Sequence, residues 1–182
     1  MKKLSLEELN RISIEEFKSA EKHPVVVILD NIRSMNNVGS FFRTGDAFRI
    51  EKLYLCGITP TPPHREISRS ALGAELSVDW EQADDTATVI QRLKAEGYQV
   101  MAVEQAEGSW ALEEFDWDIR KPLAVVFGNE VSGVDDRVME LVDGSLEIRQ
   151  YGTKHSLNVS VSAGIVLWQL LNQYQAKQGL PR

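Results

Sequence analysis

The sequence has a single cysteine, Cys56, and only three histidines. One cysteine cannot form an internal disulfide and provides no CxxC pair for a metal site, so we expect a buried, reduced thiol. The histidines, His23, His64 and His155, are too scattered along the chain to predict a zinc site. The sequence therefore indicates no metal centre. His155 could be a general base, but we interpret it as a loop residue exposed to water.

Long apolar runs are also missing. No run approaches the roughly 20 residues needed to span a bilayer. The N-terminus leads into an acidic stretch rather than into the apolar core of a signal peptide. We therefore expect a soluble, cytoplasmic protein with no membrane contact. With 182 residues, 43% hydrophobic and 26% charged, and no repeat or linker, the chain is predicted to form one domain over residues 1–182.

Two common nucleotide-binding signatures are absent. There is no GxGxxG to predict a Rossmann-type cofactor loop, and no GxxxxGK[ST] to hold a nucleoside triphosphate. The net charge of −7 argues mildly against nucleic acid, so any RNA site has to be a local basic patch. Each candidate for that patch could equally be a solvated surface charge. The candidates are Arg33, Arg65, Arg69, Arg149 and Lys154.

What is present is an alternation of apolar runs and helical patterns. The runs are short and rich in β-branched residues, as in strands buried on both faces of a parallel sheet. They lie at Val25–Leu29, Leu53–Cys56, Val100–Val103 and Leu123–Phe127. Helical spacing predicts helices at about residues 4–20, 38–48, 84–95 and 159–174. The alternation favours an α/β fold, and the last helix has enough apolar surface for a subunit interface as well.

Three polar segments lie where strands give way to turns or helices, the usual place for ligands in α/β proteins. They are residues 30–43, 128–134 and 148–162. In the first, Asn36 and Asn37 can cap a helix, Gly39 permits a close approach, and Arg43 can reach a phosphate or a sugar hydroxyl. A capped helix with a solvent-facing arginine explains this segment equally well.

The second and third segments favour a site more clearly. Glu130 is predicted at the carboxyl end of a strand beside Gly128 and Gly133, where a purely structural turn does not explain the acid. Ser156, Asn158 and Ser160 precede the last helix, and helix capping would use only one of them. The surplus of polar groups indicates a binding or catalytic role.

In this order, the segments resemble the SpoU, or TrmH-like, branch of the SPOUT RNA methyltransferases. The family motif N-x-G-x-x-x-R matches residues 37–43, a strand followed by G-x-E and a second glycine matches 125–133, and S-L-N-V-S-V matches 156–161. The resemblance covers residues 25–172. One departure is residues 149–155, where many relatives have a Pro-Met pair after the isoleucine that matches Ile148, so the loop shape there can differ.

The resemblance implies a parallel-sheet SPOUT fold with a C-terminal trefoil knot, a homodimer formed through the C-terminal helix, and methyl transfer from S-adenosylmethionine to a ribose 2′-hydroxyl of RNA. It implies cofactor contacts at Val103, Gly128, Ile148, Ser156 and Leu157. It also implies catalytic or organising positions at Asn37, Arg43, Glu130, Ser156 and Asn158.

The family account often assigns the role of base to the arginine that matches Arg43, but a guanidinium is effectively never deprotonated in a protein. We therefore expect Arg43 to bind the adjacent phosphate and to stabilise charge on the 2′-oxygen. Glu130 or a water would accept the proton, or Glu130 would orient Arg43.

The RNA substrate is less specified by the sequence. About twenty residues precede the first predicted core strand, whereas relatives acting on ribosomal RNA often carry an N-terminal RNA-binding domain. This comparison favours tRNA, and the segment 156–168 resembles enzymes that methylate the D-loop guanosine. The alternatives are an rRNA 2′-O-methyltransferase, a base methyltransferase, a non-catalytic RNA-binding protein of the same fold, and a small-molecule nucleotide-binding protein.

Overall fold

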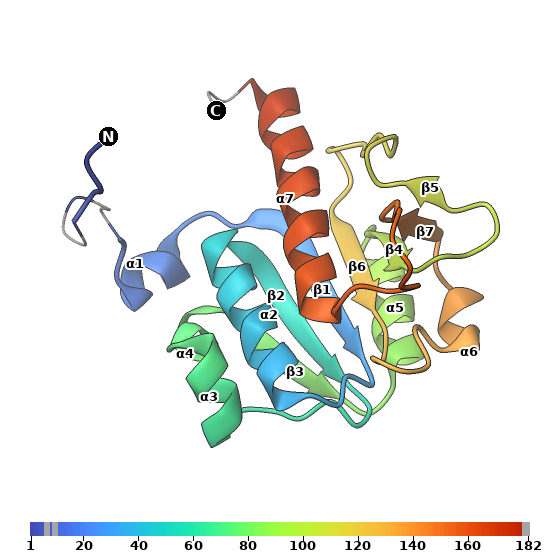
Figure 1. Cartoon of the computed structure of the whole chain (residues 1–182), viewed down its shortest axis with the longest axis horizontal. Helices are drawn as coiled ribbons and strands as arrows, with labels where there is room; N and C mark the ends of the chain where they lie inside the picture. Colours follow the sequence, from blue (N-terminus) through green and yellow to red (C-terminus); the bar gives the residue numbers. More distant parts are fainter. Residues whose placement is uncertain (6–7, 9–10, 180–182) are drawn as a thin grey trace.

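The computed structural model describes residues 1–5, 8 and 11–179 of the chain. Its centre is a seven-stranded sheet in the order β3-β2-β1-β6-β4-β7-β5 (Figure 1). Every strand pairing in this sheet is parallel. The strands are β1 (His23–Asp30), β2 (Ile50–Cys56), β3 (Trp80–Ala83), β4 (Gln99–Val103), β5 (Trp110–Ala111), β6 (Leu123–Phe127) and β7 (Gly144–Glu147). The predicted α/β architecture with a parallel sheet is confirmed.

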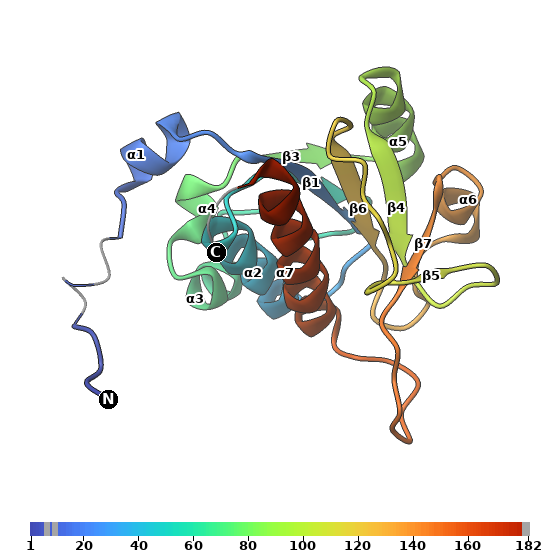
Figure 2. The same ribbon diagram turned by 90° about the horizontal axis from the view of Figure 1, so that it is seen from above.

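Helices cover both faces of the sheet, as Figure 2 shows for α2 and α7 on one side and α5 on the other. The helices are α1 (Ile14–Ser19), α2 (Met35–Ala47), α3 (Arg65–Ala71), α4 (Ala74–Ser77), α5 (Thr86–Ala95), α6 (Asp136–Met139) and α7 (Val159–Gln178). Within the described part of the chain, no helix combines the length and the apolar character needed to cross a membrane.

The continuous apolar run of β1 is explained by this double cover. Successive side chains of a strand point to opposite faces of the sheet. Val25, Val27 and Leu29 belong to the apolar cluster that includes residues of α2 and α7. Val26 and Ile28 belong to a second cluster that includes residues of α5. Since both faces of the strand are buried, neither set of positions can be polar.

Two helix predictions need correction at their starts. Of the N-terminal helix predicted at residues 4–20, the structure describes the part at Ile14–Ser19, and residues 6–7 and 9–10 of that range lie outside the described residues. Ser13 and Glu16 form a reciprocal capping box that starts the helix at this point. Helix α2 is capped by Ser34, whose Oγ accepts from the Asn37 N–H, and not by Asn36 or Asn37.

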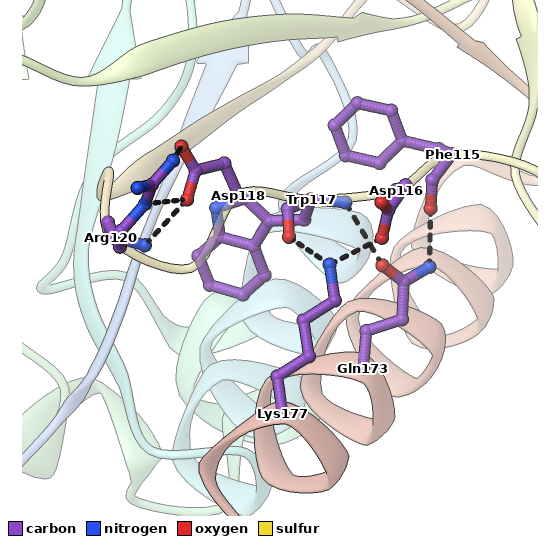
Figure 3. A network of polar contacts seen from close by, with 7 residues as sticks. All are labelled: Phe115, Asp116, Trp117, Asp118, Arg120, Gln173 and Lys177. Carbon is purple, nitrogen blue, oxygen red and sulfur yellow. Dashed lines mark hydrogen bonds and ion pairs between the residues drawn. The ribbon is translucent and has the colours of Figure 1, made fainter.

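Helix α7 is held on the sheet by residues 111–121, the segment before β6, which we call the strap. Gln173 of α7 accepts from the Trp117 N–H at 3.2 Å and donates to the Phe115 carbonyl at 2.7 Å (Figure 3). The Trp117 ring stacks on Tyr174, with 5.4 Å between the centroids. Lys177 pairs with Asp116 and with the Trp117 carbonyl. The strap therefore fixes the C-terminal half of α7.

The C-terminal trefoil knot that the resemblance implies stays a prediction.

Candidate active site

A cavity of about 800 Å³ lies at the carboxyl ends of β4, β6 and β7. This is the edge of a parallel sheet where α/β proteins bind ligands, and the volume is sufficient for a nucleoside-sized cofactor. All five residues predicted to contact the cofactor line the cavity: Val103, Gly128, Ile148, Ser156 and Leu157. The structure thus brings together residues from three separate segments, as the resemblance implies.

Gly128, directly after β6, sits where the chain passes close to itself. A Cβ atom at this position would lie 2.2 Å from both the Gly133 carbonyl carbon and the Val134 nitrogen. The turn is closed by two hydrogen bonds of 2.9 Å between the backbones of Asn129 and Gly133. A side chain at residue 128 would have to push this turn apart, so the glycine is required by the shape of the cavity wall.

Glu130 connects two of the predicted segments. Its Oε2 accepts from the Arg33 N–H at 3.0 Å, and its Oε1 accepts from the Ser34 N–H at 3.0 Å and from Asn37 Nδ2 at 2.9 Å. Asn37 in turn accepts through Oδ1 from Asn158 Nδ2 at 3.2 Å. Three predicted site residues therefore form one chain of hydrogen bonds, which we call the Glu130–Asn37–Asn158 network.

This network also positions α7. Asn158 is the N-cap of the helix, and its Oδ1 accepts from the Ser160 N–H at 2.9 Å. One side chain thus starts α7 and holds Asn37 at the beginning of α2. Of the polar groups in residues 156–160, capping uses Asn158, as expected for a segment with a surplus of such groups.

The hydrogen bonds also determine the ionisation of Glu130. Partial burial of the carboxylate would raise its pKa, but the donors from Arg33, Ser34 and Asn37 together lower the pKa below its ordinary value. A carboxylate with three donors and a lowered pKa is a poor proton acceptor. Its geometry suits it to hold the segment 33–37 against the cavity wall.

Arg43 lies apart from this network. It is exposed on α2, it is not a lining residue of the cavity, and within the described residues it forms no ion pair or side-chain hydrogen bond. The structure therefore does not show Glu130 orienting Arg43. Gly39, one turn earlier on α2, faces α3: a Cβ there would lie 2.0 Å from Ser70 Oγ, so the close approach at this glycine is helix packing.

Two cavity-wall residues were not predicted from the sequence. Asn129 donates from Nδ2 to the Asn31 carbonyl at 2.7 Å and accepts through Oδ1 from the Val131 N–H at 2.9 Å, which stabilises the turn after β6. Glu104 follows β4 directly and lines the cavity. Its position after a buried strand is the same signal that identified Glu130, but no motif drew attention to it.

Comparison with known proteins identifies the family. A family model described as the SpoU rRNA Methylase family matches residues 24–168, most of the chain. The chain belongs to the SpoU family. Like its members, it is an RNA 2′-O-methyltransferase that uses S-adenosylmethionine. The cavity fits this cofactor, because it combines aliphatic walls with carboxylates at the end of a parallel sheet.

Relatives of known name act on different RNAs. A tRNA (guanosine(18)-2'-O)-methyltransferase of Thermus thermophilus is 30% identical over 95% of this chain and 87% of its own length. The crystal structure of the TrmH/SpoU tRNA modifying enzyme of A. aeolicus superposes with a TM-score of 0.80 at 28% identity, covering 91% of this chain and 82% of that one. An AdoMet-bound rRNA methyltransferase from Sinorhizobium meliloti superposes with a TM-score of 0.78 at 29% identity, covering 84% and 57%. The relatives with these names therefore include enzymes for tRNA and an enzyme for rRNA.

Proposed function

We propose that this SpoU-family enzyme methylates the ribose 2′-hydroxyl of a tRNA nucleotide in the cytoplasm, with the D-loop guanosine as the first candidate. The observation that supports catalysis is the Glu130–Asn37–Asn158 network at the wall of the cofactor cavity. A protein that only bound RNA would not need such a network there. The tRNA substrate is supported by the names of the Thermus and A. aeolicus relatives.

In this proposal the protein contributes positioning and charge. During the transfer the S–CH3 bond breaks, the new O–CH3 bond forms, and the hydroxyl proton leaves to water. Arg43 binds the neighbouring phosphate and stabilises negative charge on the 2′-oxygen as it develops. Glu130 stays ionised and fixes Asn37 at the start of the helix that carries Arg43. Water is the proton acceptor, because Glu130 already accepts three hydrogen bonds.

The arginines support an RNA-binding role unequally. Arg149 is already paired with Glu113 and Glu114, at 3.0 and 2.6 Å. Arg33, Arg65 and Arg69 are exposed and form no ion pair with another described residue. We therefore assign RNA phosphate binding to these three and to Arg43, and we assign Arg149 to holding the loop after β7 against the strap.

The test of this function is transfer of labelled methyl from S-adenosylmethionine to RNA from cells that lack the enzyme, with the tRNA and rRNA fractions kept separate. We expect a 2′-O-methylnucleoside in the tRNA fraction, identified by nucleoside mass spectrometry. Label in rRNA alone would contradict the tRNA assignment, and label on a base would contradict the ribose assignment. No transfer to either fraction, with cofactor binding intact, would contradict catalysis by this chain alone.

We also propose a homodimer through α7. The buried face of this helix packs on the sheet, yet the opposite face is apolar as well: Val161, Ile165 and Trp168 are 51%, 39% and 60% exposed. Their spacing of four and three residues places them on one stripe. An exposed apolar stripe of this kind is typical of a protein–protein interface.

Replacing Trp168 with glutamate is expected to convert a dimer to a monomer, because it replaces the most exposed apolar side chain of this stripe with a charge. Sedimentation velocity measures the change. The matched control is Ile58→Glu, which charges an exposed apolar residue on the loop after β2 and is expected to leave the dimer intact. A wild-type monomer at micromolar concentration, or a Trp168→Glu dimer, would contradict the proposed interface.

A further inference from the structure

The cofactor cavity has an unbalanced charge. Its lining includes the carboxylates of Glu104, Glu130 and Asp136, and within the described residues it includes no lysine, arginine or histidine. Glu130 is engaged with the segment 33–37, as described above. Asp136 lies at the exposed start of α6. Glu104 is therefore the carboxylate of the cavity without an assigned role.

The Glu104 side chain is rigidly held. Oε1 accepts from the Gln105 N–H at 3.0 Å and Oε2 accepts from the Val134 N–H at 3.2 Å. A Cβ on Gly133 would lie 2.4 Å from Glu104 Oε2, so the carboxylate packs directly against the turn after β6. Each oxygen retains acceptor capacity beyond these two bonds.

The Glu104 backbone is anchored as well. Its N–H donates to the Leu146 carbonyl at 3.2 Å, and its carbonyl accepts from Ser145 Oγ at 2.7 Å. Both contacts tie the residue to β7, next to the end of β4. The charge therefore stands at a fixed place in the wall, and no cationic side chain among the described residues neutralises it.

The cofactor and the product of methyl transfer differ in charge. S-adenosylmethionine carries a sulfonium and an ammonium against one carboxylate, whereas S-adenosylhomocysteine has a neutral thioether and no net charge. A fixed carboxylate in a partly enclosed cavity attracts the positively charged S-adenosylmethionine more strongly than the neutral S-adenosylhomocysteine. From this geometry we propose that Glu104 is a specificity-determining residue that favours binding of S-adenosylmethionine over the neutral product.

This role would relieve product inhibition, because loss of the methyl group removes the positive charge that the wall favours. The inference rests on the cofactor and not on which RNA is methylated. It can therefore be tested with the free protein, without RNA.

The experiment is isothermal titration of the wild type and of Glu104→Gln with S-adenosylmethionine, S-adenosylhomocysteine and sinefungin, which carries an amine in place of the methylsulfonium. We expect Glu104→Gln to weaken binding of the two cationic ligands about tenfold relative to the neutral product, equivalent to about 1.4 kcal/mol. Equal weakening of all three would mean that Glu104 contacts a part that they share, either the adenosine or the amino-acid end. This outcome or no change would overturn the proposal.

The matched control is Glu107→Gln, which removes the same charge from an exposed residue that does not line the cavity; its affinities should equal those of the wild type. Thermal unfolding without ligand checks that Glu104→Gln is folded. If it is not, the wild type still gives a test: raising the salt concentration should weaken the cationic ligands and leave the neutral product unaffected. An identical response of all three ligands to salt would overturn the proposal.

Failure of the proposed function can be told apart from failure of this inference. Cofactor binding without RNA methylation would refute the proposed function, and the role of Glu104 would still be decided by the measured affinities for the three ligands.

Discussion

Replacing Arg43 with alanine is expected to lower the single-turnover rate of RNA methylation by about 10²–10³-fold while the affinity for S-adenosylmethionine stays unchanged. The first effect follows from the proposed role, in which the guanidinium stabilises charge on the attacking oxygen. The second follows from the structure, because Arg43 is exposed and is not a lining residue of the cofactor cavity. Rapid-quench measurement with saturating RNA separates the chemical step from RNA binding.

Arg43→Lys keeps the positive charge but loses the planar fork that can contact a phosphate and the 2′-oxygen together. We expect it to recover a small part of the lost rate. A lysine variant with nearly full activity would refute a specific role for the guanidinium. Arg120→Ala is the control: it removes another exposed arginine, which pairs with Asp118 in the strap, and its rate should match the wild type.

The strands of the centre of the sheet could be predicted because burial on both faces demands a continuous apolar sequence. The prediction at Leu123–Phe127 has the observed bounds, and β1 extends the predicted Val25–Leu29 by a few residues. Strand β7, Gly144–Glu147, could not be predicted in this way. It is short, and its buried Ser145 is compatible with the core only because its hydroxyl donates to the Glu104 carbonyl. A tertiary contact of this kind leaves no pattern in the sequence.

The same difference applies to the site. Motifs at the ends of predicted strands located the cavity wall, because the carboxyl ends of parallel strands meet at one edge of a sheet. The pairing within the Glu130–Asn37–Asn158 network joins residues 93 and 121 positions apart and depends on which oxygen faces which donor. Sequence could name these three residues as candidates for the site, but it left open whether Glu130 is a base, an orienting group for Arg43, or neither.

Glu130→Gln and Glu130→Ala distinguish these roles. Glutamine keeps one carbonyl oxygen, which can replace Oε1 and accept from the Ser34 N–H and Asn37 Nδ2, whereas alanine removes every acceptor. If Glu130 organises the site, the alanine variant should lose on the order of 10²-fold in single-turnover rate, since small displacements of reacting groups have effects of this size. The glutamine variant should retain much more activity. If Glu130 is the proton acceptor, both variants should be equally inactive, because neither side chain can take up the proton.

The pH dependence of stability gives an independent test of the organising role. The pKa of Glu130 is lower in the folded protein than its ordinary value. Burial raises this pKa, but the hydrogen bonds from Arg33, Ser34 and Asn37 together lower it by more. Its stabilising contribution is therefore complete well above the ordinary glutamate pKa of about 4.3 and is lost as the pH falls through the lower folded value. The difference in unfolding free energy between the wild type and Glu130→Ala, from urea titrations, should shrink in this acidic range and stay constant near neutrality. A difference that instead grew as the pH fell would require a raised pKa, which is the property of a proton acceptor and not of a carboxylate held by three donors.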